Sequence, residues 1–148
     1  MTGATGNLPW ARSLTLAEVR ASYTGSCERD LGMVLTGIGP NWLEGQIPAG
    51  PATQDMTVGL YHGAITILAE TLGSIAANLC LDDKTYRAVG QILEVHHFEP
   101  VVRGPIIGRA TPILLEGERH VWTVDITDQT GTRVSSATVT MAIIESPR

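Results

Sequence analysis

The sequence feature that most constrains the fold is a long apolar run, GLYHGAITILAETLGSIAANLCL, at residues 59–81. Its large aliphatic side chains recur at spacings of three and four, the period of one face of an α-helix: Ile65, Leu68, Leu72, Ile75 and Leu79. Other apolar residues extend this surface around the helix, so such a helix must be buried on most faces. The rest of the chain therefore has to wrap around it.

The same run is long enough to span a bilayer, but its content argues against a membrane helix. Glu70 stands near its centre, where a carboxylate in a lone span would cost about 2.5 kcal/mol or more. Gly, Ser, Thr and Asn residues also interrupt the run. We therefore expect a buried helix of a globular domain and no membrane partner.

Four strand-like segments follow the helix, each with alternating apolar and polar residues: YRAVGQILEVHHFEPV, GPIIGRATPILLE, RHVWTVDITD and TRVSSATVTMAII. Short turns separate them, which predicts an antiparallel meander. Ahead of the long helix, Thr15 and Glu18 form a capping-box pattern that predicts a short helix ending near Gly25. Two apolar segments around residues 39–41 predict a strand, a turn and a strand, and residues 48–56 are expected to form a loop.

These elements predict an α+β fold of the hotdog type, in which a curved antiparallel sheet wraps around one long central helix. The 148 residues are enough for one compact domain and too few for two domains that each have a sufficient core. We therefore assign residues 1–148 to a single domain, with residues 1–12 as a flexible leader.

Charge and cysteine content exclude several classes of function. The net charge is -5 and the chain has no basic run, which argues against a nucleic-acid partner. Cys27 and Cys80 form neither a disulfide framework nor a metal-ligand spacing, and the chain shows no signal-peptide pattern, so we expect reduced thiols and a cytoplasmic location. His96 and His97 would point to opposite faces of a strand, so no metal site is expected.

Glu70 is the only residue with a formal charge in residues 56–81. A carboxylate buried without partners has a high desolvation cost or becomes neutral, so its presence in an apolar helix needs a reason. One interpretation is structural: Glu70 lies on a solvent-exposed stripe of the helix together with Thr71, Ser74 and Asn78.

The other interpretation of Glu70 is catalytic. Ser74 lies one turn further along the same helix face, so a hydroxyl and a carboxylate can address one small molecule. The first N–H groups of a helix lack internal partners, so the Gly63 region can donate hydrogen bonds to a developing oxyanion. A carboxylate facing such donors can act as a general base or as a nucleophile towards an acyl group.

Three segments carry a family resemblance: HGAITILAETLGSIAANLCL, VGQILEVHHFEPVVRG and VWTVDITDQTGTRVSSATVTMAII. They resemble the hotdog-fold acyl-CoA thioesterases of the phenylacetate-pathway type, among them the 1,4-dihydroxy-2-naphthoyl-CoA hydrolases and the Glu-dependent 4-hydroxybenzoyl-CoA thioesterases. The similarity covers residues 59–144. It implies hydrolysis of an acyl-CoA, with an aromatic acyl group favoured, to free acid and CoA. No cofactor is implied, since coenzyme A is part of the substrate.

The resemblance also assigns roles to individual residues. It makes Glu70 the catalytic carboxylate, Ser74 the hydroxyl that positions water or the intermediate, and Gly63 the oxyanion donor, with His62 beside it near the thioester. In this family the Glu and the Gly of one site come from opposite subunits, which implies a homodimer or homotetramer. The residues at positions that contact CoA or the acyl group are Gly90, His97, Gly117, Glu118 and Arg119.

Two departures from the family pattern leave an alternative open. The family usually has a second Gly after His-Gly and nine steps from His to Glu, whereas this chain has Ala64 and eight steps. The family also tends to place a Gln six residues before the His, where this chain has Met56, so Gln54 is the candidate in its place. The alternative is a non-catalytic acyl-CoA-binding or scaffold protein with the same fold.

Overall fold

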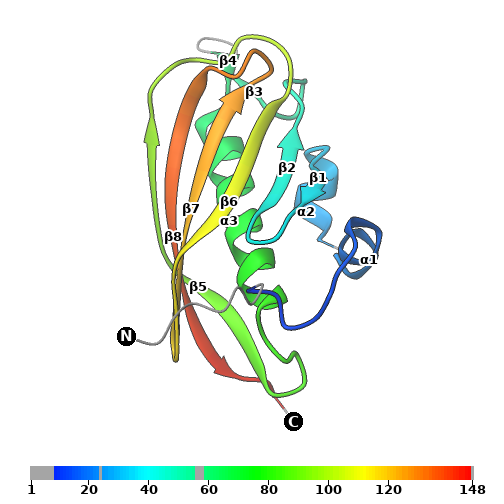
Figure 1. Cartoon of the computed structure of the whole chain (residues 1–148). Coiled ribbons are helices and arrows are strands. Elements are labelled where there is room, and N and C mark those ends of the chain that lie inside the picture. Colours follow the sequence, from blue (N-terminus) through cyan, green and yellow to red (C-terminus); the bar gives the residue numbers. More distant parts are fainter. Residues whose placement is uncertain (1–8, 24, 56–58, 148) are drawn as a thin grey trace.

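The computed structural model describes residues 9–23, 25–55 and 59–147. The helices are α1 (Leu16–Ser22), α2 (Ser26–Asp30) and α3 (His62–Leu79). The strands are β1 (Val34–Ile38), β2 (Leu43–Ile47), β3 (Gln54–Asp55), β4 (Gly59–Leu60), β5 (Tyr86–His97), β6 (Ile106–Glu116), β7 (Arg119–Asp128) and β8 (Arg133–Glu145). Figure 1 shows the long strands curving around α3, which confirms the predicted α+β architecture.

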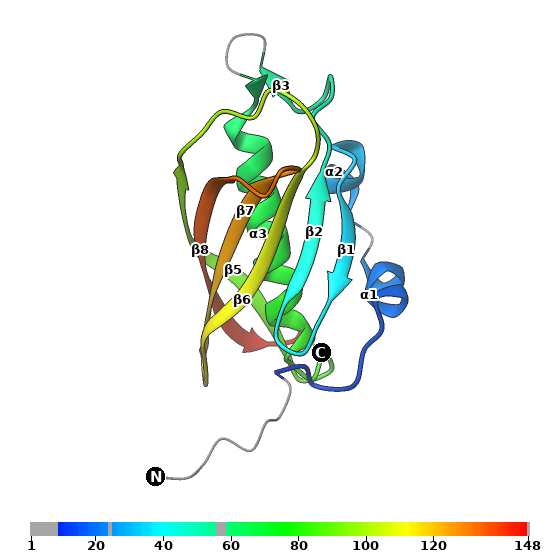
Figure 2. The ribbon, with the colours of Figure 1, turned by 45° about the horizontal axis from the view of Figure 1, so that its top comes forward.

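The main sheet has six antiparallel strands in the order β1-β2-β6-β7-β8-β5, visible in Figure 2. The predicted meander is confirmed for β6, β7 and β8. It is wrong for β5, which pairs with β8 along its whole length instead of with β6. The physical reason is that β2 and β7 already occupy the two edges of β6, so no edge of β6 is free for β5. Residues 98–105 therefore connect the edge strand β5 to β6, and β7 and β8 lie between these two strands in the sheet.

Local sequence signals before α3 predicted part of the structure. The capping box is confirmed, because the Glu18 N–H donates to Thr15 Oγ1 (3.3 Å) and the Thr15 N–H donates to Glu18 Oε2 (2.7 Å). The strands around residues 39–41 are confirmed as β1 and β2. Helix α2 was not predicted, and neither were the two-residue strands β3 and β4, the first of which lies in the segment expected to be a loop.

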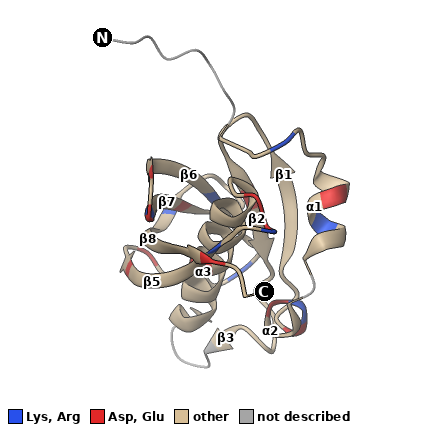
Figure 3. Cartoon of the chain, turned by 90° about the horizontal axis from the view of Figure 1, so that it is seen from below, with Lys and Arg blue, Asp and Glu red and all other residues tan. Residues whose placement is uncertain are grey.

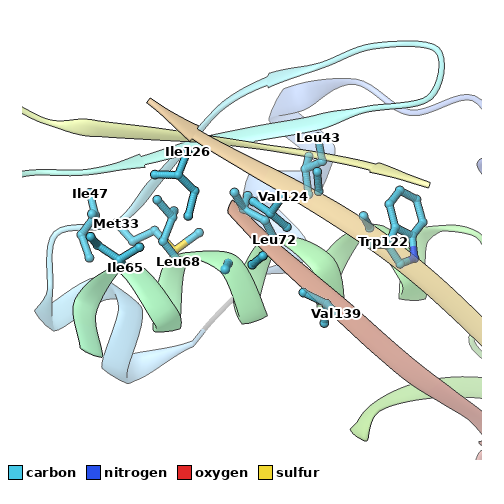
Figure 4. Packing of buried hydrophobic residues seen from close by; sticks show 14 of the residues in the cluster. Met33, Leu43, Ile47, Ile65, Leu68, Leu72, Trp122, Val124, Ile126 and Val139 are labelled. Atoms are coloured by element: carbon cyan, nitrogen blue, oxygen red, sulfur yellow. The ribbon is translucent and has the colours of Figure 1, made fainter. Parts of the chain in front are cut away.

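The core is the contact between α3 and the inner face of the sheet. Figure 4 shows Ile65, Leu68 and Leu72 of the helix among side chains of the strands. A Cβ atom on Gly108 would lie 2.8 Å from one methyl carbon of Leu72, and a Cβ on Gly45 would lie 3.0 Å from the other. Gly45 and Gly108 face each other on β2 and β6. The paired glycines therefore form a recess that receives Leu72.

The end of the predicted leader is part of the packed structure. The Trp10 ring is buried and stacks on Trp122 with 6.1 Å between ring centroids, and its Nε1 donates to the Gly39 carbonyl (2.8 Å). The Ala11 N–H donates to the Leu79 carbonyl at the end of α3 (2.9 Å). The prediction of a flexible leader over residues 1–12 is therefore wrong for Trp10 and Ala11, while residues 1–8 lie outside the described part of the chain.

Charged residues are distributed unevenly over the helices. Figure 3 marks both acidic and basic residues on α1 and α2, whereas Glu70 is the only residue with a formal charge in α3. Within the described residues, no helix combines the length and the apolar character needed to cross a membrane.

Replacing Gly73 with Ala should test the helix-to-sheet contact. A Cβ at Gly73 would lie 2.9 Å from Val139 Cβ, and a β-branched side chain cannot easily move away. We expect a loss of about 1–3 kcal/mol in unfolding free energy by urea denaturation, although Gly→Ala normally favours a helix by up to about 1 kcal/mol. Val139→Ala removes the two methyl groups that would lie 3.0 Å from the added Cβ, so Gly73→Ala should cost less in that background. A stabilised Gly73→Ala protein would contradict the close contact.

Candidate active site

Glu70 is half-buried on α3 and its carboxylate lies against strand β5. A Cβ atom on Gly90 would be only 3.3 Å from Glu70 Oε1, so the absence of a side chain at Gly90 makes room for the carboxylate. Together they line a cavity of about 260 Å³, whose other lining residues are Gln91, Ile92, Leu93 and Val139. The one charge of α3 therefore faces a cavity in which a small group can be bound.

The position of this helix face is set by Asn78, two turns beyond Glu70. The Asn78 amide donates to the Ala88 carbonyl (3.1 Å) and accepts from the Ala88 N–H (2.9 Å), so it binds β5 much as a neighbouring strand would. Ser74 lies between the two on the same face and is half-buried. Thr71 is buried, with 2% of its surface exposed. The interpretation that these residues form a solvent-exposed stripe is therefore wrong for Thr71 and Asn78.

A β-bulge next to Glu70 links two cavities. Gly90 faces Met141 and Ile92 faces Thr140 on β8, which leaves Gln91 without a partner residue in the register. Gln91 lines the cavity beside Glu70, and it also lines a second cavity of about 490 Å³ near the β6–β7 turn. Sequence reasoning missed Gln91, although a glycine inside a strand pattern is a known signal for a bulge.

The β6–β7 turn contains three residues that the resemblance assigns to ligand binding. Glu118 and Arg119 line the second cavity. Gly117 has φ of 47° and thus adopts the left-handed conformation that glycine tolerates best. The structure therefore brings Gly90 close to Glu70, and it places the turn at the next cavity along β5.

The N–H groups at the start of α3 have no acceptor within the helix. The Ala64 N–H donates to the Tyr61 carbonyl (2.9 Å) and forms the first hydrogen bond of the helix. The N–H groups of His62 and Gly63 lie before this bond and have no carbonyl of the helix to donate to. Seven residues separate Gly63 from Glu70, which corresponds to about 10 Å along the helix axis. Within one chain, these two predicted site residues are therefore too far apart to contact the same carbonyl group.

His62 and His97 form a stacked pair that joins the start of α3 to the end of β5. Their ring centroids are 3.9 Å apart and their planes differ by 6°. Ser135 Oγ donates to the His96 carbonyl (2.7 Å) and lies 3.3 Å from His97 Nδ1. Burial, followed by the nearby His62 and His96, lowers the pKa of His97 below its ordinary value.

The electrostatic environment of Glu70 favours a protonated carboxyl group. Burial, and after it the negative charge of Glu28 on α2, raises the pKa of Glu70 above its ordinary value. None of the ion pairs between described residues involves Glu70. The ionised form is therefore a stronger base than an exposed carboxylate. Glu28 was not singled out in the sequence, where it has no distinguishing pattern.

The remaining candidates lie outside this cavity. Gln54 is exposed on β3, where its Nε2 donates to the Val102 carbonyl (3.4 Å), and Met56 lies outside the described residues. Burial raises the pKa of the Cys80 thiol to about 12, so this thiol is not a ready nucleophile. Within the described ranges, no three His, Cys, Asp or Glu side chains gather as metal ligands.

Comparisons with known proteins agree with one another. The sequence profile of the thioesterase superfamily matches residues 59–135. The proofreading thioesterase EntH of Cronobacter sakazakii is 32% identical over 135 residues, which cover 91% of this chain and 98% of that protein. The 1,4-dihydroxy-2-naphthoyl-CoA hydrolase of Escherichia coli is 30% identical, with 91% and 98% covered.

Solved structures give the same result. A thioesterase from Haemophilus influenzae superposes with a TM-score of 0.86 at 30% identity, and the match covers 92% of this chain and 94% of that one. A glutamine-to-alanine variant of a thioesterase from Pseudomonas aeruginosa superposes with a TM-score of 0.88 at 28% identity, with 93% and 99% covered.

We expect the unfolding free energy to fall as the pH decreases through about 6.5, in part because of His97. The fold holds the pKa of His97 below its ordinary value, so the unfolded chain takes up this proton first. The His97→Gln variant should therefore lose less stability than the wild type between about pH 7.5 and pH 5.5 in urea unfolding. His96→Gln, at an exposed histidine, removes only one of the causes that lower the pKa of His97, so it should change the pH dependence less. Equal pH dependence of His97→Gln and the wild type would contradict this expectation.

Proposed function

The chain belongs to the thioesterase superfamily and is a thioester hydrolase, and from this premise we propose that it hydrolyses acyl-CoA at a site built around Glu70. The observation that carries the proposal is the half-buried Glu70 carboxylate, which lies against Gly90 at the wall of a cavity. We favour an aromatic acyl group, because a relative of 30% identity is named as a hydrolase of a dihydroxynaphthoyl-CoA. The cytoplasmic location expected from the sequence stays a prediction.

Glu70 can promote the reaction in either of two ways. As a general base, its ionised carboxylate takes a proton from the water that attacks the thioester carbonyl. As a nucleophile, it attacks that carbonyl itself and forms an acyl intermediate that water then hydrolyses. In both cases the C–S bond breaks and coenzyme A leaves as its thiol. Ser74, one turn away on the same helix face, is placed to hold the water or the intermediate.

The spacing along α3 supports a site shared between two copies of the chain. A thioester carbonyl must lie within hydrogen-bond reach of the oxyanion donor while it is attacked at its carbon. Because Gly63 and Glu70 are about 10 Å apart along the helix, one chain cannot provide both contacts. The site becomes complete when Gly63 of a second copy faces Glu70.

The edges of the sheet favour strand β5 as the contact between copies. On the opposite edge strand, the Leu35 carbonyl already accepts hydrogen bonds from Arg20 Nε (2.9 Å) and Nη2 (2.6 Å). On β5 the Asn78 amide bonds the backbone groups of Ala88, whereas further along the strand Ile92 is 60% exposed beside the Glu70 cavity. A free edge with exposed apolar side chains is the type of edge that pairs with another strand. We therefore propose a homodimer through β5, or a homotetramer made of two such dimers.

The two cavities, which have Gln91 as a common lining residue, support a path for the coenzyme A portion of the substrate. Arg119 is exposed at the β6–β7 turn, and a guanidinium group binds phosphate with charge-assisted hydrogen bonds. Arg109, by contrast, already binds the Glu44 carboxylate (2.7 Å) and stacks on Trp42. We place the phosphates near Arg119, with Gly117 and Glu118 in the same turn, and the thioester beside Glu70.

Three further candidates lie near the start of α3. His62 and His97 are stacked there, and Gln54 sits on β3, which pairs with the β4 strand just before the helix. We propose that His62 and His97 contact the thioester or the acyl group, and that Gln54 contributes to the same end of the site.

Replacing Glu70 with Gln should abolish turnover while binding survives, since the amide keeps the size of the side chain and loses its basicity. We expect kcat to fall by about 10² to 10⁴-fold with little change in Kd for coenzyme A. Thiol release measured over a panel of aromatic and aliphatic acyl-CoA substrates identifies the best substrate, and calorimetry measures binding. Ser74→Ala is expected to cost less. A folded Glu70→Gln protein with wild-type turnover would show that Glu70 is not the catalyst.

The same panel tests the non-catalytic alternative. Binding of several acyl-CoA compounds by the wild-type protein without release of thiol from any of them would favour an acyl-CoA-binding protein.

Replacing Gly90 with Ala should lower activity without lowering stability. The added methyl group would lie 3.3 Å from Glu70 Oε1 and displace the carboxylate by a few tenths of an ångström. Removing a glycine from a strand usually stabilises it by about 0.5–1 kcal/mol, so the unfolding free energy should stay level or rise. We expect kcat for the best substrate to fall by roughly tenfold. In Gly50→Ala, the control, the added methyl has no neighbour within 4 Å, so unchanged activity is expected.

A mixed dimer should show whether the site is shared. Gly63→Pro removes an N–H in the first turn of α3, where no helix hydrogen bond is lost, and the added ring displaces the exposed Tyr61 side chain. This variant should lose about 10²- to 10³-fold in kcat. Purified with two different tags, a heterodimer of a Gly63→Pro chain and a Glu70→Gln chain contains one intact shared site. It should therefore recover about half of the wild-type activity. A heterodimer as inactive as its two parents would rule out the shared site.

A further inference from the structure

A second carboxylate, Glu28, lies close to the catalytic helix although it belongs to α2. The Thr71 hydroxyl, on the residue that follows Glu70, donates to Glu28 Oε1 (3.2 Å). Thr71 is almost fully buried, so this contact is held in the packed interface between α2 and α3. Glu28 is thereby fixed beside the turn of α3 that carries Glu70.

The two carboxylates have opposite surroundings. Burial acts to raise the pKa of Glu28, but its own N–H and the hydroxyl groups beside it, of which Thr71 donates a hydrogen bond, outweigh burial and hold that pKa below its ordinary value. A Cβ atom on Gly25 would touch both Glu28 Oε2 and the Tyr23 hydroxyl, so these two oxygens lie on the same side of Gly25. Among the described residues, no donor group offsets the effect of burial on Glu70. Glu28 therefore stays ionised over a pH range in which Glu70 still carries a proton.

The other described groups that face Glu70 do not offset the negative charge of Glu28. On β5 and β8 the neighbours of the carboxylate are Gly90, Gln91, Ile92, Leu93 and Val139, none of which is charged. Ahead of α2, Tyr23 is kept protonated, because burial and then Glu28 raise its pKa. Among the described residues, Glu28 is thus the one charged group that raises the pKa of Glu70.

We propose that Glu28 is a positioning residue for the catalytic carboxylate: its fixed negative charge destabilises the ionised form of Glu70 and makes Glu70 a stronger base towards the attacking water. The inference rests on the proposed function of Glu70. Pairs of carboxylates whose environments push their proton affinities apart are a known way to obtain a base that works near neutral pH. In this protein Thr71 connects the two members, because it follows Glu70 in the helix and holds Glu28 by its hydroxyl.

The direct test is to titrate both carboxylates by NMR in the full-length protein labelled with ¹³C at the glutamate carboxyl carbons. The chain has nine glutamates, and the Glu28→Gln and Glu70→Gln variants assign the two resonances. In the wild type, Glu70 should titrate above Glu28. In Glu28→Gln, which keeps an acceptor for Thr71, the Glu70 titration should move to lower pH. A wild-type protein in which Glu28 titrates above Glu70 would overturn the proposal.

Asp30→Asn provides the matched control, since it removes one negative charge from the exposed end of the same helix. It should leave the Glu70 titration unchanged. An unmoved Glu70 titration in Glu28→Gln, or an equal movement in Asp30→Asn, would show that Glu28 has no specific effect on Glu70.

Activity measurements separate this inference from the proposed function. The acidic limb of the pH profile of kcat/KM should move with the Glu70 titration in Glu28→Gln and stay in place in Asp30→Asn. If the NMR titration moves while the acidic limb does not, Glu70 is not the base, and the proposal of a positioning role fails even though the two carboxylates interact.

Discussion

Burial of helix α3 against the concave face of the sheet is the interaction on which the rest of the structure depends. The helix is too apolar to be stable in water, and its buried side chains form a large part of the core described at the inner face of the sheet. Leu72 enters the recess above the Gly45–Gly108 pair, and Gly73 allows the helix to approach Val139 closely. These contacts fix the rotation of α3 about its axis, so that the face carrying Glu70, Ser74 and Asn78 turns towards β5.

This rotation determines the chemistry that Glu70 can perform. Asn78 satisfies both backbone groups of Ala88, which holds β5 beside the helix and leaves the glycine of the bulge opposite Glu70. The half-buried carboxylate thus faces a cavity, and none of the ion pairs between described residues involves it. A group in such a position resists ionisation and accepts a proton readily once ionised, which are the properties that a general base requires.

The length of α3 limits which of the proposed site residues one chain can bring to the same substrate. The donors at the helix start and the carboxylate two turns later are held apart by a rigid rod, and no side-chain motion closes about 10 Å. The same rod ends near an exposed strand edge at β5, which can accept a second copy. Catalysis and assembly would then depend on one another, since the contact that covers the β5 edge would also complete the site.

The sequence alone was sufficient for features that local pattern determines. The period of the apolar residues gave the position of α3, Thr15 and Glu18 gave the start of α1, and a lone charge in an apolar helix identified Glu70. The pairing of β5 with β8, the packing of Trp10 on Trp122, the bulge at Gln91 and the approach of Glu28 to Thr71 were decided only by the tertiary structure. The physical reason is that each of these contacts joins residues far apart in the chain, or depends on strand register, and no local periodicity specifies which distant partner a buried surface will meet.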